Sequence, residues 1–143
     1  MNYRNAPYFD RYADSFEKMY HAIRNTHLSV INYKFIVMIN SILGITTKIS
    51  WSTAYRSSGR KTEKLIDICK KTGADEYVSG PSAQAYLDAA QFKKNSIRLT
   101  WMDYSGYPIY NQLYPPFVHQ VSIIDLIFNT GPKALIYMKK VKK

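Results

Sequence analysis

Cysteine, acidic side chains and long apolar runs are scarce in this sequence, and each shortage excludes a class of protein. The single cysteine, Cys69, excludes an internal disulfide and a cysteine metal cluster, and it favours a reducing compartment, for which we expect the cytoplasm. Ten Asp and Glu residues stand against twenty Lys and Arg residues, so the formal net charge is +10. A charge of this sign favours anionic partners such as nucleotide phosphates, nucleic acid or an anionic membrane face.

Several motifs of known chemistry are also missing. The sequence contains neither the G-x-G-x-x-G fingerprint nor the Walker phosphate loop, and no serine lies in a G-x-S-x-G turn. His21, His27 and His119 lack the spacing of a metal site, so we expect no metal and no cofactor. The longest apolar stretch, 28–45, is interrupted by polar residues, which predicts a core helix and not a membrane span.

Hydrophobic periodicity predicts a mixed α/β chain whose 143 residues form one domain. We expect helices at 8–23, 28–43, 61–71, 82–92, 122–131 and 132–138, and strands at 47–52, 76–79 and 96–104. Strands that alternate with helices form parallel sheets. The sequence therefore predicts an α/β fold with a small parallel three-stranded sheet flanked by helices, two N-terminal helices and a C-terminal helical segment, similar to part of a Rossmann-like domain.

The loop before the helix that starts at Lys61 has the features of an anion site. Arg60 and Lys61 carry positive charge there, and the free N–H groups of a helix N-terminus attract anions. Ser57 and Thr62 add hydroxyl groups on either side of these cations. The four residues are therefore candidate ligands of a phosphate or carboxylate group. An ordinary helix capped by Thr62 or Gly59, with solvated cations, explains the same pattern.

Two further loops are expected at the same edge of the sheet. Open parallel sheets bind ligands beyond the carboxyl ends of their strands. The segments that follow the second and third predicted strands are rich in hydroxyl and aromatic side chains. They supply the candidate ligands Ser79, Gly80, Ser82, Tyr110 and Gln112 and the candidate catalytic residue Asp103.

Structural roles explain these polar residues as well. Gly80-Pro81 has the composition of an ordinary turn, and Asp103 can anchor its own loop. Asp125 lies three residues after Ser122, which is the spacing of a helix cap. The lysines at 139, 140, 142 and 143 are typical of a solvated tail. From the residues alone, the chain is a basic α/β protein with a cluster of loops suited to an anion.

Five segments in order resemble the WbqC-like protein family. They are A-P-Y-F at 6–9, G-R-K-T-E-K-L-I-D-I-C-K-K-T-G-A-D at 59–75, Y-V-S-G-P at 77–81 with Y-L-D at 86–88, D-Y-x-x-x-P-x-Y-x-Q-L at 103–113 and S-I-I-D-L-I-F-N-x-G at 122–131. These segments extend over nearly the whole chain, and the chain resembles the C-terminal part of a family member.

This resemblance implies a bacterial protein of surface-polysaccharide (O-antigen) biosynthesis. It implies a transferase that attaches glycine, or another aminoacyl group, to an amino sugar linked to a nucleotide or phosphate. In that role Arg60 and Lys61 would hold phosphate, Asp103 would act as a base or orient an amine, and Tyr110 and Gln112 would contact the sugar.

Departures from the family pattern leave two alternatives. Family members carry a further N-terminal region with a Q-P-x-F-x-P motif that this sequence lacks, and Gln84, Ala85 and Tyr107 replace the family's lysine, aspartate and histidine. A truncated or split copy that binds without catalysing, completed by the missing half in trans or by a homo-oligomer, fits these departures. A nucleic-acid-binding module fits the +10 charge and thirteen tyrosines, but the tyrosines lack the spacing of a known RNA-binding motif.

Overall fold

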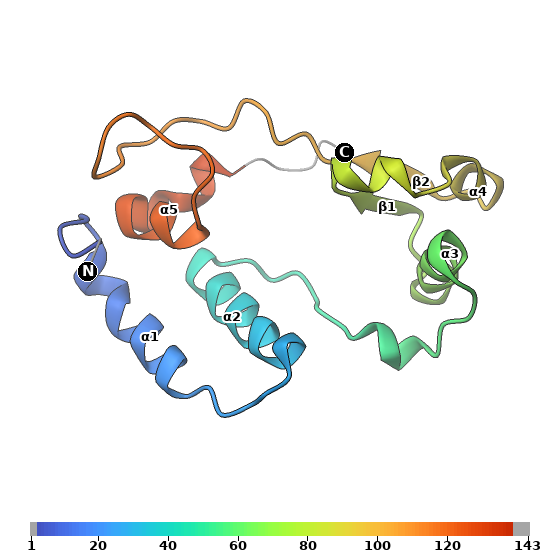
Figure 1. Ribbon diagram of the computed structural model, residues 1–143, viewed down its shortest axis with the longest axis horizontal. Coiled ribbons are helices and arrows are strands. Elements are labelled where there is room, and N and C mark those ends of the chain that lie inside the picture. Colours follow the sequence, from blue (N-terminus) through green and yellow to red (C-terminus); the bar gives the residue numbers. More distant parts are fainter. Residues whose placement is uncertain (1–2, 139–143) are drawn as a thin grey trace. The chain divides into compact units, whose positions relative to one another are not determined.

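The computed structural model describes residues 3–138, so the predicted lysine tail at 139–143 lies outside the described residues. Within them the chain is a mixed α/β protein with five α-helices and a sheet of two parallel strands (Figure 1). The chain divides into two compact units: Met1–Thr47 with Gly106–Lys143, and Lys48–Ser105. The expectation that residues 1–143 form a single domain stays a prediction. None of the helices in 3–138 has the length and apolar character that crossing a membrane requires.

The first unit is helical. It contains α1 (Phe9–His21), α2 (Leu28–Leu43), α5 (Ile123–Thr130) and the 3-10 helix η3 (Gly131–Tyr137). The bounds predicted for the second helix are confirmed, and Gly44 ends it in the left-handed conformation with φ +67°. The segment predicted as a final helix is a 3-10 helix, because Pro132 lacks the N–H group that would continue the α-helical hydrogen bonds of α5.

Aromatic rings form the core of this unit around Phe128. The rings of Tyr3, Phe9 and Phe16 lie 5.5, 5.3 and 5.5 Å from it, centroid to centroid, in tilted or edge-on geometry. The Tyr8 N–H donates to the Phe128 carbonyl across 3.0 Å. Helix α5 is therefore held against the start of the chain by both ring packing and a backbone hydrogen bond.

The second unit contains the sheet. Its elements are η1 (Ser52–Tyr55), α3 (Lys61–Thr72), β1 (Glu76–Ser79), η2 (Pro81–Ala85), α4 (Ala89–Lys94) and β2 (Arg98–Trp101), with η1 and η2 as 3-10 helices. The strands pair in parallel from Glu76 opposite Arg98 to Ser79 opposite Trp101, and η2 and α4 form the crossover. The predicted parallel pairing of these two strands is confirmed. Phe92 is fully buried at the centre of this unit and stacks on Tyr77.

Two further predicted elements differ from the observed ones. The segment 47–51 has no regular structure and is not a third strand. Ile49 and Trp51 in it are 38% and 44% exposed, and the sheet of the described residues pairs β1 with β2 alone. The predicted helix at 82–92 is broken, because the Asp88 carboxylate accepts the N–H groups of Ala90 and Gln91 and so caps α4 as a new helix.

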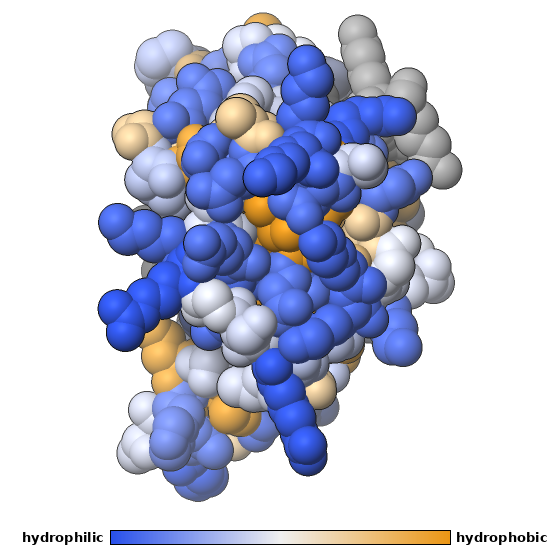
Figure 2. Space-filling view, turned by 90° about the vertical axis from the view of Figure 1, so that its right-hand side faces the viewer, coloured by the Kyte–Doolittle hydropathy of each residue, from blue (hydrophilic) through white to orange (hydrophobic). Residues whose placement is uncertain are grey.

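Hydrophilic side chains cover much of the exposed surface. Figure 2 shows a face covered mainly by hydrophilic residues, with a small apolar area visible between them. Among the described residues, charged side chains lie outside the core with one exception, Asp125, which is 7% exposed. Asp125 therefore indicates a candidate functional site, because burial of a carboxyl group costs free energy unless the group is hydrogen-bonded or paired.

Candidate functional site

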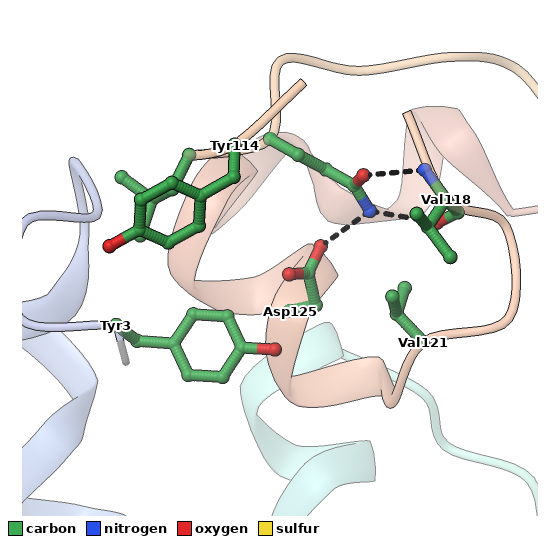
Figure 3. A pocket seen from close by; sticks show the side chains of 7 residues that line it. Tyr3, Tyr114, Val118, Val121 and Asp125 are labelled. Atoms are coloured by element: carbon green, nitrogen blue, oxygen red, sulfur yellow. Dashed lines mark hydrogen bonds between the residues drawn. The ribbon is translucent and has the colours of Figure 1, made fainter. Parts of the chain in front are cut away.

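The buried Asp125 side chain accepts hydrogen bonds from a neighbouring loop. The Tyr110 hydroxyl donates to Asp125 Oδ1 across 2.6 Å, and Gln112 Nε2 donates to the same oxygen across 3.1 Å. Figure 3 shows the bond from Gln112 and the Tyr3 ring with its hydroxyl on the side of Asp125. Both donors are neutral, and in residues 3–138 no lysine, arginine or histidine forms an ion pair with this carboxyl group.

The cap of α5 explains why Asp125 can face the loop. The Ser122 hydroxyl accepts the Ile124 N–H across 3.3 Å, and the Ser122 carbonyl accepts the Asp125 N–H across 2.9 Å. Ser122 therefore caps the helix with its own side chain and backbone. Asp125 is not the capping group that its spacing suggested, and its carboxyl group points to the loop instead.

Gln112 fixes the loop that carries these donors. Its Nε2 donates to the Val118 carbonyl across 2.9 Å, and its Oε1 accepts the Val118 N–H across 2.8 Å. The Tyr110 ring packs edge-on against Phe117 and Tyr137, with centroids 5.1 and 5.6 Å away. The loop is thus held in place by a two-bond clamp and by aromatic contacts, which preorganises the donors around Asp125.

The electrostatics keep the tyrosines protonated. Burial, and then the hydrogen bond to Asp125, raise the pKa of Tyr110 far above its ordinary value. Burial and the charge of Asp125 raise the pKa of Tyr3 as well. Both phenols are therefore hydrogen-bond donors throughout the neutral range, and neither serves as a base there.

A pocket of about 280 Å³ opens beside the Asp125 carboxyl group (Figure 3). Its lining residues are Tyr3, Gln112, Leu113, Tyr114, Val118, Val121 and Asp125. The polar side chains among these lining residues are the Gln112 amide, the phenols of Tyr3 and Tyr114, and the Asp125 carboxyl group. Asp125 is the one acidic residue of the lining, which contains no basic residue. A carboxylate with neutral neighbours attracts a cation of matching size, and an ammonium group fits that description. We call this the Asp125 pocket.

The loop before α3 already holds a carboxylate of the chain itself. The Ser58 N–H and Lys71 Nζ donate to Asp67 Oδ2 across 2.8 and 2.7 Å, and together they lower the pKa of Asp67. Lys71 first, and then the Ser58 N–H, cause this shift. The predicted ligands Arg60 and Lys61 are exposed, and Ser57 is half-buried. One backbone N–H of this loop is therefore already used by Asp67, and the binding of an external anion there stays a prediction.

Thr62 has a structural role in this region. It is 4% exposed, and its hydroxyl oxygen accepts the Asp88 N–H across 3.1 Å. The bond joins the start of α3 to the start of α4. The Thr62 hydroxyl group, predicted to bind a ligand, thus forms a hydrogen bond that links two helices.

The carboxyl ends of β1 and β2 meet as predicted. The Met102 N–H donates to the Ser79 carbonyl across 2.8 Å, and a Cβ on Gly80 would lie 3.4 Å from the Tyr104 hydroxyl. Asp103 lies in this loop, exposed, and its Oδ1 accepts the Ser105 N–H across 2.8 Å. Ser82 is exposed in the first turn of η2.

The predicted site residues thus form groups in two units. Ser79 and Gly80 lie beside the loop of Asp103 in the second unit, whereas Tyr110 and Gln112 belong to the first unit and meet on Asp125. The described residues contain no group of three His, Cys, Asp or Glu side chains that could hold a metal. Sequence reasoning missed Asp125 as the centre of a site, although one acidic residue within I-I-D-L-I-F is a signal of a buried polar role.

Comparison with known proteins agrees with the resemblance. Residues 1–137 match the WbqC-like protein family. A protein of Mycobacterium tuberculosis (strain ATCC 25618 / H37Rv), named "Uncharacterized protein Rv1507c", is 43% identical over 138 residues. Those residues are 96% of this chain and 60% of that protein, so the chain spans about three fifths of this relative. No solved structure matches the chain significantly.

Proposed function

Because the chain belongs to the WbqC-like protein family, we propose that it takes part in transferring a glycyl or other aminoacyl group to an amino sugar, in the cytoplasmic stage of bacterial surface-polysaccharide biosynthesis. The observation that carries the proposal is the buried Asp125 carboxyl group at the wall of a pocket, with neutral hydrogen-bond partners. An amino sugar brings the ammonium group that such a pocket lacks.

The chemistry follows from the position of Asp125. As a carboxylate it holds the substrate ammonium group and takes one of its protons, which leaves a neutral amine with a free electron pair. The amine nitrogen then forms a bond to the carbonyl carbon of an aminoacyl ester or thioester. The bond from that carbon to the leaving oxygen or sulfur breaks, and the leaving group departs with the electron pair. The amine's second lost proton passes to the leaving group or to solvent, and the product is an amide.

The second unit supplies a phosphate site in this proposal. Arg60 and Lys61 are exposed cations at the start of α3, and Ser57, Ser79, Gly80 and Ser82 belong to loops with hydroxyl and N–H donors. Within this unit the loops would bind a phosphate group, as the corresponding loops of a Rossmann-like domain do. The charge in this unit supports the assignment, since its ten Lys and Arg residues exceed its six Asp and Glu residues by four.

One pair of variants tests the proposal and decides between two acids. Asp125→Asn keeps the shape of the side chain and removes its basicity, while Asp103→Asn does the same to the acid predicted from the sequence. The assay offers a nucleotide-linked amino sugar and an aminoacyl ester or thioester, and mass spectrometry detects the amide. Asp125→Asn is expected to lower the transfer rate by about 10²–10⁴-fold, the range of general-base catalysis.

Three other outcomes have definite meanings. If Asp103→Asn alone lowers the transfer rate, Asp103, in the loop after β2, is the catalytic residue and Asp125 is not. Binding of the amino sugar without any amide product would overturn the transferase in favour of a binding copy. Retention of single-stranded DNA or RNA that weakens steeply with salt would point to the nucleic-acid alternative instead.

A further inference from the structure

A second pocket, of about 220 Å³, lies one helical turn further along α5. Its lining residues are Tyr8, Ile109, Tyr110, Asn111, Asn129, Thr130, Lys133 and Tyr137. Seven of these eight side chains carry a polar group, and Lys133 is the one that carries a charge. We call it the Lys133 pocket. Nothing in the proposed transfer chemistry uses it.

Two buried polar residues of this pocket, Asn129 and Thr130, each donate a hydrogen bond to a backbone carbonyl of α5. Asn129 Nδ2 donates to the Asp125 carbonyl across 2.8 Å, and the Thr130 hydroxyl donates to the Leu126 carbonyl across 2.7 Å. Both residues are 8% exposed, so these bonds fix the orientation of their side chains. The amide oxygen of Asn129 and the lone pairs of the Thr130 hydroxyl are left as acceptors, which suit the hydroxyl groups of a sugar.

The remaining wall of the pocket adds aromatic faces and a cation. The rings of Tyr110 and Tyr137 lie 5.6 Å apart, and the Tyr8 ring covers Gly131 closely. Lys133 is exposed and forms no ion pair within residues 3–138. Because its ammonium group is free, it can donate to an oxyanion on a ligand that occupies the pocket.

The two pockets are neighbours. Asp125 and Asn129 are four residues apart on α5, so their side chains lie on the same helix face about 5–6 Å apart. Tyr110 lines the Lys133 pocket while its hydroxyl bonds to Asp125, and the adjacent residues Asn111 and Gln112 line one pocket each.

We propose that the Lys133 pocket binds the ring hydroxyl groups and an oxyanion substituent, phosphate or carboxylate, of a saccharide. Asn129 and Thr130 accept from the hydroxyl groups, and Lys133 donates to the oxyanion. The inference rests on the proposed function in one respect, since it assigns this pocket to the molecule whose amine the Asp125 pocket holds. It thereby names the acceptor class as an amino sugar that also carries a negative charge.

Binding of simple probes tests this pocket without any transfer. Amide chemical shifts of the whole chain are followed by NMR during titration with glucose 1-phosphate, glucuronate, glucose and inorganic phosphate. Glucose 1-phosphate or glucuronate is expected to shift the side-chain amide of Asn129 and the backbone amide of Thr130 in a saturable way. The stronger of the two identifies phosphate or carboxylate as the substituent. Glucose and inorganic phosphate are expected to bind more weakly than either.

Lys133→Ala is the decisive variant, because Lys133 is exposed and its removal leaves the core unchanged. It is expected to weaken binding of the charged sugar by at least about tenfold, the size of one charge-assisted hydrogen bond. Lys34→Ala, an exposed lysine of α2 in the same unit that does not line the pocket, is the matched control and keeps the affinity.

Three results overturn the inference. They are the absence of saturable shifts with both charged sugars, equal affinity in Lys133→Ala and the wild type, and shifts confined to the loop of Arg60. Asp125→Asn separates this test from the proposed function, because these probes carry no amine. Probe binding that survives Asp125→Asn, in a protein that forms no amide, would leave the Lys133 pocket established and the transferase refuted.

Discussion

The hydroxyl group of Tyr110 lies 2.6 Å from Asp125 Oδ1 and joins the loop of the first unit to the first turn of α5. Gln112 reinforces this bond, since it donates to the same oxygen and clamps Val118 with its amide. Because Asp125 is nearly inaccessible to solvent, each donor that is removed leaves a buried acceptor less well satisfied. The stability of the loop and the shape of the Asp125 pocket therefore depend on the same few contacts.

Tyr110→Phe is expected to lower the free energy of unfolding by about 1–3 kcal/mol at neutral pH, the cost of losing one hydrogen bond to a buried carboxylate oxygen that keeps the hydrogen bond from Gln112. The pKa of Tyr110 is raised in the folded state, so its stabilising effect is complete below about pH 10, the ordinary tyrosine value, and declines as the pH rises further. Urea denaturation between neutral and strongly alkaline pH measures both effects. The variant should show a shallower alkaline loss than the wild type.

The matched control for that experiment is Tyr114→Phe, whose side chain is 67% exposed. It should change the free energy of unfolding by less than about 0.5 kcal/mol, as surface substitutions do. Equal stability loss in both variants, or an unchanged alkaline slope in Tyr110→Phe, would mean that the bond to Asp125 contributes nothing.

Gly131→Ala is expected to be strongly destabilising. The residue ends α5 with φ +54°, and a Cβ there would lie 2.4 Å from Cδ1 of the Tyr8 ring. The strained backbone conformation and the overlap with the ring each destabilise the variant. We therefore expect the free energy of unfolding to fall by about 2–4 kcal/mol, measured by thermal or urea unfolding. Gly44→Ala separates the two causes, because Gly44 has φ +67° but open space around it. It should cost about 1 kcal/mol. Equal losses would assign the whole effect to the backbone.

Phe92→Ala is expected to destabilise the second unit by about 3–5 kcal/mol, because the side chain is fully buried and its loss leaves a cavity beneath the Tyr77 ring. Val78→Ala on β1, 39% exposed, is the control and should cost about 1 kcal/mol or less. Guanidinium denaturation followed by circular dichroism gives both values. A Phe92→Ala variant as stable as Val78→Ala would show that this core is not the source of the unit's stability.

Asp67→Asn is expected to loosen the loop before α3. Its carboxylate holds the Ser58 N–H and the Lys71 ammonium group, and these partners lower the pKa of Asp67. The contact therefore stabilises the loop above about pH 4, the ordinary value, and is lost as the pH falls below it. Hydrogen exchange of the Ser58 amide should speed up in the variant at neutral pH.

In the wild type the same exchange should show an additional acceleration in acid, beyond the intrinsic pH dependence. Asp75→Asn, an exposed acid elsewhere in the unit, serves as the control. Unchanged protection of Ser58 in Asp67→Asn would show that the loop is held by other contacts.

Local patterns predicted the regular elements well. The apolar stripe of 28–43 and the glycine that follows define α2, and 76–79 is β1 to the residue. Gly73 ends α3 in the left-handed conformation, as its place after the helix indicated. The information in these cases lies within a few residues of each element, because helix periodicity, strand length and glycine caps are properties of neighbouring side chains.

The sequence by itself determined the family, the places of most helices and of two strands, the parallel pairing of β1 with β2 and the excess of positive charge. Only the tertiary structure decided that the Asp125 carboxyl group accepts hydrogen bonds from Tyr110 and Gln112 and does not cap its helix together with Ser122. It also left 47–51 outside the sheet. The reason is physical: these outcomes depend on residues far apart along the chain that meet through a loop without periodicity, so burial and hydrogen-bond partners become defined only when the chain has folded.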